Sequence, residues 1–143
     1  MLKGIPSILS PELVKGLMEM GHGDEIVIAD GHFPAARLNE NVIRCDGHQI
    51  VPILTAVLQH LPLDTYVDKP VALMDVLPGD SIPNIWEQYV TILKQEGFKK
   101  DSIKWESRYD FYERAKSAFA VITTSEKALY ANVILTKGIV SEE

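Results

Sequence analysis

The sequence predicts an α/β fold, a three-layer α/β/α sandwich in which helices cover both faces of one central sheet. Three observations predict it: helical stripes alternate with short strand-like runs, several of those runs are apolar throughout, and no linker divides the 143 residues. Strands without polar alternation are buried on both faces, and helices on each side of a sheet provide that burial. A chain of this length predicts a single domain, over residues 1–143.

The first helix and the first strand have clear local signals. Ser10 is a typical N-cap, and Pro11 suits the first helical position, where its missing N–H costs nothing. Apolar side chains then recur at helical spacing, at Leu13, Val14, Leu17 and Met18. We expect Gly21 to end this helix as a left-handed residue. The apolar run 26–29 lies between two aspartates and predicts a buried strand.

Two more helices and one strand are predicted in the middle of the chain. Apolar side chains recur at helical spacing over residues 51–61 and 85–93, and Gly97 ends the second stripe. The apolar run 71–74 between them predicts a strand, which ends before the turn signal Pro78-Gly79-Asp80.

The final third combines one helix with strands rich in β-branched and apolar residues. The helix is predicted over residues 110–118, and we expect its Arg114 to be a solvated side chain near Asp110 or Glu113. The strands are predicted over 102–106, 120–123 and 130–135.

Composition and charge exclude several classes of partner. The 20 acidic residues outnumber the 14 basic ones, which argues against a nucleic acid and against an anionic membrane surface. The single cysteine, Cys45, forms no internal disulfide, and its strand-like setting predicts a buried, unreactive thiol. The chain shows neither the apolar run of a signal peptide nor a stretch of roughly 18 apolar residues. We therefore expect a soluble, cytoplasmic protein.

Polar residues flank the first predicted strand. His22 lies between two glycines at the helix-to-strand junction, and Asp30 follows the strand at the end where α/β sheets bind ligands. An imidazole and a carboxylate in one cleft form an acid/base pair. Because a strand of about 5–6 residues spans up to ~20 Å, the two share a site only if the loop folds back or a neighbouring subunit completes it. With Asp24 and His32, they are also candidate metal ligands.

Further candidates come from the last third of the chain. Arg108 lies at a predicted strand-to-helix turn, and Tyr130 and Asn132 open the last predicted strand. Together with His22 and Asp30, these side chains suit a small neutral polyol, which needs hydrogen-bond donors, acceptors and an aromatic surface.

Several segments carry a resemblance to a known family. The segments MGHGDEIVIAD, DGHFPA, RCDG, FYERAKSAFA and YANVILTKG occur in this order. The chain resembles the fucose mutarotase branch of the ribose pyranase/fucose mutarotase family over essentially its whole length. The resemblance implies an α/β/α sandwich that assembles into rings, commonly pentamers paired as decamers, with active sites at subunit interfaces.

The resemblance also assigns roles to residues. It implies that His22 is catalytic, as the proton donor in the interconversion of α and β anomers of L-fucose, and that no cofactor or metal is required. It implies sugar binding by a larger set, with the role of His32 left open: Asp30, Arg108, Tyr130, Ala131 and Asn132.

Three alternatives stay open. A ribose pyranase would interconvert the pyranose and furanose forms of D-ribose by the same ring opening. A non-catalytic sugar-binding module would keep Arg108 and Tyr130 without depending on His22. A metal-dependent sugar enzyme would contain a stoichiometric ion.

Overall fold

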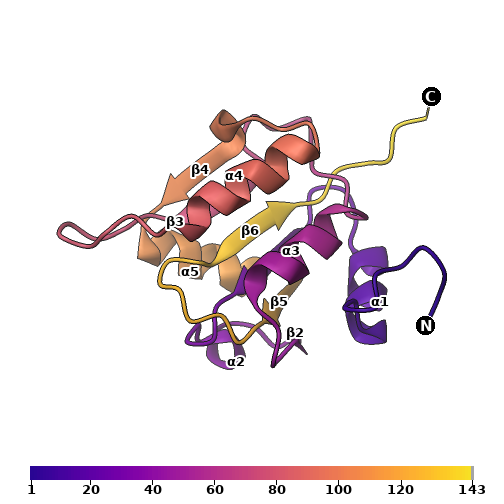
Figure 1. The fold of residues 1–143 in the computed structure, drawn as a ribbon, viewed down its shortest axis with the longest axis horizontal. Coiled ribbons are helices and arrows are strands. Elements are labelled where there is room, and N and C mark those ends of the chain that lie inside the picture. Colours follow the sequence, from indigo (N-terminus) through magenta and orange to yellow (C-terminus); the bar gives the residue numbers. More distant parts are fainter. Residues whose placement is uncertain (143) are drawn as a thin grey trace.

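The computed structural model describes residues 1–142, and within them the chain forms one six-stranded sheet of order β2-β5-β1-β6-β3-β4 (Figure 1). The strands are β1 (Glu25–Ala29), β2 (Val42–Arg44), β3 (Val71–Met74), β4 (Ile103–Glu106), β5 (Ala120–Thr123) and β6 (Val133–Thr136). The helices are α1 (Pro11–Glu19), α2 (Ala35–Leu38), α3 (Ile50–Leu58), α4 (Ile85–Gln95) and α5 (Arg108–Ser117), with a short 3₁₀ turn at Lys100–Ser102. The predicted mixed α/β fold around a central sheet is confirmed.

The sheet is mostly parallel, and β6 is its exception. β6 pairs antiparallel with β1 on one side and with β3 on the other, whereas β1, β2 and β5 are mutually parallel and β3 is parallel to β4. The carboxyl ends of the five parallel strands therefore share one edge of the sheet.

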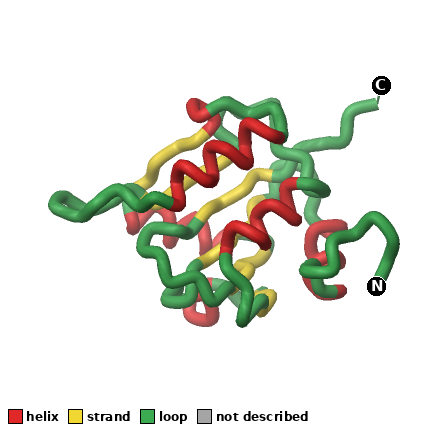
Figure 2. Tube along the Cα trace, in the orientation of Figure 1, coloured by secondary structure: helices red, strands yellow, loops and turns green. Residues whose placement is uncertain are grey.

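Apolar clusters lie on opposite faces of the sheet. Ile26 and Ile28 of β1 belong to a cluster with side chains of α1, α3 and α4. The alternate residues, Val27 and Ala29, belong to a second cluster with side chains of α2 and α5. Figure 2 shows the same division, with the long helices α3 and α4 in front of the strands and α5 behind them. This arrangement explains why the runs 26–29, 71–74 and 120–122 are apolar at every position.

The first helix begins as predicted but ends differently. The Ser10 side chain accepts a hydrogen bond from the Leu13 N–H at 3.2 Å, and Pro11 is the first helical residue. The chain then leaves α1 in an extended conformation at Met20. Gly21 is therefore not the left-handed residue. That conformation falls on Gly23 (φ 89°), inside a turn that the Asp24 carboxylate closes by accepting from the Gly21 N–H.

Other boundaries also differ from the prediction. The last strand begins at Val133 rather than at residue 130, because Tyr130 takes a left-handed φ of 56° that no strand contains. The short elements α2 and β2 were not predicted, since four and three residues show no periodicity. Cys45 follows β2 and is buried, and burial raises the pKa of its thiol, as expected for an unreactive cysteine.

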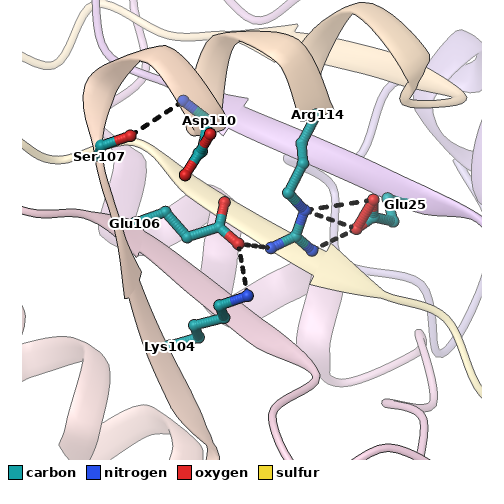
Figure 3. Close-up of polar contacts among 6 residues, drawn as sticks. All are labelled: Glu25, Lys104, Glu106, Ser107, Asp110 and Arg114. Carbon is teal, nitrogen blue, oxygen red and sulfur yellow. Dashed lines mark hydrogen bonds and ion pairs between the residues drawn. The ribbon is translucent and has the colours of Figure 1, made fainter.

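The expectation for Arg114 is wrong. Its side chain is only 25% exposed and lies beneath α5, where it bonds Glu25 of β1 and Glu106 of β4 (Figure 3). Helix α5 crosses the sheet face at this point, so a side chain that points inward from it meets both strands. The helix is thereby bonded to two strands that are not neighbours in the sheet.

No helix within residues 1–142 is both long enough and apolar enough to cross a membrane.

Candidate functional site

A pocket of about 190 Å³ opens at the edge of the sheet where the parallel strands end. Four of the predicted site residues line it: Asp30, Arg108, Tyr130 and Asn132. The remaining lining combines polar and apolar side chains: His32, Phe33, Met74, Asp75, Leu77, Tyr112 and Leu129. The structure thus brings together residues from the segment after β1, the end of β3, α5 and the segment before β6. The mixed lining of the pocket suits a small polyol with one apolar face.

Asp30 is a buried residue of this pocket, and both its backbone and its carboxylate are hydrogen-bonded. Its N–H donates to the side-chain oxygen of Asn132 at 2.8 Å, and its Oδ1 accepts from the His32 N–H at 2.9 Å. Burial raises the pKa of the Asp30 carboxyl, against the opposing effect of these hydrogen bonds. A raised pKa and a fixed orientation suit a carboxyl group that exchanges hydrogen bonds with a sugar hydroxyl.

Arg108 is placed by the start of α5. Ser107 caps that helix by accepting from the Asp110 N–H at 3.1 Å, so Arg108 stands in the first turn. Its guanidinium lies 5.2 Å from the centre of the Tyr112 ring, a cation–π distance. The ring of Phe33 packs edge-on against Tyr112 at a centroid distance of 5.4 Å. The pocket therefore contains a positive group on an aromatic wall.

Tyr130 lines the pocket, whereas its neighbour Ala131 does not. The Tyr130 hydroxyl donates to the Asp80 carboxylate and accepts from the Leu77 N–H at 3.3 Å. The bond to Asp80 raises the pKa of the phenol, so this hydroxyl stays protonated. Ala131 is fully buried and does not line the pocket.

His22 lies at the opposite end of β1 from the pocket. It precedes the strand at Glu25, whereas Asp30 follows the strand after Ala29, and the loop does not fold back. Instead, the Gly23 N–H donates to the Lys137 carbonyl beyond β6 at 2.8 Å. Within one chain the structure does not bring His22 and Asp30 together.

At its own end of the sheet, His22 pairs with Asp64. The imidazole Nε2 lies 3.0 Å from Asp64 Oδ1, and the same oxygen accepts from the Tyr66 N–H at 3.0 Å. The Tyr66 N–H, followed by His22, lowers the pKa of the Asp64 carboxyl. An ionised carboxylate here selects the tautomer with its proton on Nε2. Because the His22 side chain is 44% exposed, Nδ1 is the nitrogen that can exchange protons with a ligand.

Sequence reasoning missed Asp64. Its contact with His22 joins residues 42 positions apart, and the surrounding segment Leu61-Pro62-Leu63-Asp64 has no motif that indicates a histidine partner. Its only signal would have been an aspartate in a mostly apolar segment, since Asp64 is 3% exposed.

The candidate metal ligands are not grouped. Within residues 1–142 no three His, Cys, Asp or Glu side chains come close enough to hold a metal ion. His22 and Asp24 lie before β1, and Asp30 and His32 lie after it.

Comparisons with known proteins show which family the chain resembles. The model of the RbsD / FucU transport protein family matches residues 3–140. The chain is 51% identical to the fucose mutarotase of Mus musculus over 96% of this chain and 94% of that protein. It is 49% identical to the L-fucose mutarotase of Haemophilus influenzae (strain 86-028NP), over 97% of both chains.

Solved structures show the same likeness. The fucose mutarotase of Streptococcus pneumoniae, solved in complex with L-fucose, superimposes with a TM-score of 0.96 at 48% identity and covers 98% of this chain and 100% of that one. Bacillus subtilis RbsD, complexed with D-ribose, superimposes with a TM-score of 0.71 at 25% identity, over 93% of this chain and 95% of that one. With a family model that spans nearly its whole length and relatives that share half of its residues, the chain belongs to the RbsD / FucU family.

Proposed function

We propose that this protein is an L-fucose mutarotase, an isomerase that interconverts the α and β anomers of L-fucose. The observation that carries the proposal is the likeness to the fucose mutarotase solved with L-fucose, at a TM-score of 0.96 and 48% identity. The pocket lined by Asp30, Arg108 and Asn132 supports it, because these side chains offer the donors and acceptors that a monosaccharide needs.

The reaction is a proton exchange at the sugar ring. A base removes the proton from the anomeric hydroxyl while an acid protonates the ring oxygen, so the C1–O bond to the ring breaks and an aldehyde forms. Rotation about C1–C2 and ring closure by the reverse transfers give the other anomer. His22 is the proton donor in its doubly protonated form: Asp64 accepts the hydrogen bond from Nε2, and the proton on Nδ1 passes to the ring oxygen and returns to Nδ1 when the ring closes. The reaction needs no cofactor or metal.

The sugar-binding roles follow from the pocket. Asp30 binds a sugar hydroxyl, Arg108 and Tyr130 fix the ring, and Asn132 both contacts the sugar and holds the Asp30 backbone. Ala131 contributes to sugar binding through its backbone, as the link between Tyr130 and Asn132. His32 lines the same pocket and is left without an assigned step.

A neighbouring subunit completes the site in this proposal. One chain holds the pocket and His22 at opposite ends of β1, so a ring in which each pocket receives the next subunit's imidazole supplies both. The same proposal includes assembly into pentamers paired as decamers and a cytoplasmic location. It also includes a single mutarotase domain over residues 1–143 with α/β/α layering. The apolar clusters on both sheet faces support the layering.

Mixing two inactive variants tests the shared site. His22→Ala and Asp30→Ala proteins, dissociated together and reassembled, are expected to regain up to about a quarter of the wild-type rate, because that share of random interfaces unites an intact pocket with an intact imidazole. Each variant reassembled alone is the control. A mixture that stays as inactive as its components would contradict a site shared between subunits.

Saturation-transfer NMR on the anomeric protons tests the function itself. We expect enzyme-dependent transfer of saturation between the α and β signals of L-fucose. D-ribose is measured in a parallel tube for comparison. Transfer only between ribose pyranose and furanose signals would instead identify a ribose pyranase. Folded protein that produces no saturation transfer with either sugar would refute catalysis. Titration with each sugar would then test whether the protein is a binding module.

Replacement of Arg108 by alanine is expected to weaken L-fucose binding by about 10–100-fold, as a lost charge-assisted hydrogen bond does. The dissociation constant is measured by NMR titration. Arg44→Ala is the matched control, because Arg44 is an exposed arginine whose ion pair is with Asp46. Unchanged affinity in Arg108→Ala would make Arg108 a surface charge.

A further inference from the structure

The segment 130–132 is held from behind by helix α4. The Trp86 indole N–H donates to the Tyr130 carbonyl at 2.8 Å, and the Tyr89 hydroxyl donates to the Ala131 carbonyl at 2.6 Å. Neither Trp86 nor Tyr89 lines the pocket. Two side chains one helical turn apart therefore bond two successive carbonyls on the far side of the sugar-binding residues.

The segment needs such support because its backbone is strained. Tyr130, at φ 56°, is the one non-glycine residue within residues 1–142 with a positive φ. A bulky side chain disfavours this conformation, and it persists where the surroundings impose it. The turn decides where the Tyr130 ring lies, and two residues later it decides where Asn132 meets the Asp30 N–H.

Both donors are well placed to impose the turn. Tyr89 is 1% exposed, and burial raises the pKa of its phenol above the ordinary value, so it remains a donor. Trp86 is buried with its ring edge-on to Trp105 at a centroid distance of 5.8 Å. The Ala131 carbonyl belongs to a fully buried residue, and a buried carbonyl without its donor is costly.

We propose that Trp86 and Tyr89 are positioning residues for sugar binding: their two hydrogen bonds hold the left-handed turn that presents Tyr130 and Asn132 to the pocket. The inference rests on the proposed function for its sugar, but the hold on the turn is a property of the free protein. Some determinants of sugar affinity then lie on α4, outside the residues that contact the ligand.

The test uses Tyr89→Phe and Trp86→Phe, which remove the donors and keep aromatic rings. Each variant is expected to raise the dissociation constant of L-fucose about tenfold, the loss typical of one buried hydrogen bond. The Asp30 amide is expected to exchange with deuterium about tenfold faster than in the wild type, because its acceptor Asn132 loses its fixed position. Exchange at Val27, in the middle of β1, serves as the reference for overall stability.

Leu93→Ala is the control for a purely structural effect. Leu93 is a buried residue of α4 that makes no hydrogen bond to the turn, so its replacement lowers the melting temperature while leaving sugar affinity and the Asp30-to-Val27 exchange ratio unchanged. The same loss of affinity in Leu93→Ala, or wild-type affinity and exchange in both Phe variants, would overturn the proposal. If wild-type protein does not bind L-fucose, the proposed function fails, and the exchange ratio still decides whether α4 holds the turn.

Discussion

Replacing His22 by alanine is expected to lower enzyme-dependent exchange between the anomers of L-fucose by roughly 10²–10⁴-fold, the contribution typical of one positioned acid or base. The His22 side chain is 44% exposed and bonded to Asp64 at Nε2, so the variant loses the proton donor without opening the core. The rate is measured by saturation transfer at several sugar concentrations.

The expected change lies in turnover rather than in binding. The pocket residues Asp30 and Arg108 are untouched in His22→Ala, so the dissociation constant of L-fucose should change far less than the rate. His60→Ala is the matched control, because His60 is an exposed histidine that follows α3. Sedimentation of both variants verifies that assembly is intact. Near-normal turnover in assembled His22→Ala protein would remove His22 from the mechanism.

Elements with local signals were predictable from the sequence. The start of α1 was predicted from Ser10 and Pro11, and β1 and β3 from their apolar runs, because caps and burial act within a few residues. The order of strands was not predictable, since β6 inserts antiparallel between β1 and β3 through pairings distant in sequence. The three-residue β2 is too short for any period to appear.

The distinction between local signals and contacts distant in sequence also applies to the site. Asp30 and Arg108 were identified because both lie at the ends of regular elements, where ligand-facing groups gather. Asp64 was not, because its contact with His22 is made in space only. His22 and Asp30 form one polar group in the sequence because they flank the same short strand, β1. In the folded chain they lie at its opposite ends, so His22 is far from the pocket.

The contacts of Arg114 were equally hidden, and they have a large energetic consequence. Its Nη1 lies 2.8 Å from Glu106 Oε1, and its Nε lies 3.1 Å from Glu25 Oε2 (Figure 3). The pKa of the guanidinium is raised, since the hydrogen bonds and charges of the two glutamates outweigh its burial. The Glu106 side chain is 5% exposed, and its Oε2 is buried without a partner in the described part of the chain.

Replacement of Arg114 by alanine is therefore expected to lower the free energy of unfolding by about 3 kcal/mol, because it leaves the Glu106 carboxylate buried with an incomplete set of partners. The remaining Lys104, 3.3 Å from the same oxygen and 58% exposed, keeps the loss at the lower end of the range for broken buried pairs. Urea unfolding followed by circular dichroism measures it.

Two further variants separate the charge from the packing. Lys116→Ala removes an exposed cation on the same helix, paired with Glu113, and should change the free energy of unfolding by less than about 1 kcal/mol. Arg114→Met with Glu106→Gln removes the guanidinium and the more deeply buried of its two carboxylate partners. It should recover much of the stability that Arg114→Met alone loses, because the carboxylate left without the arginine is then Glu25, which is 25% exposed. A double variant no more stable than Arg114→Met would mean that the guanidinium acts through its packing under α5. Recovery would instead assign the loss to the buried charge of Glu106, at the strand end where the chain turns into α5 and carries Arg108 to the pocket.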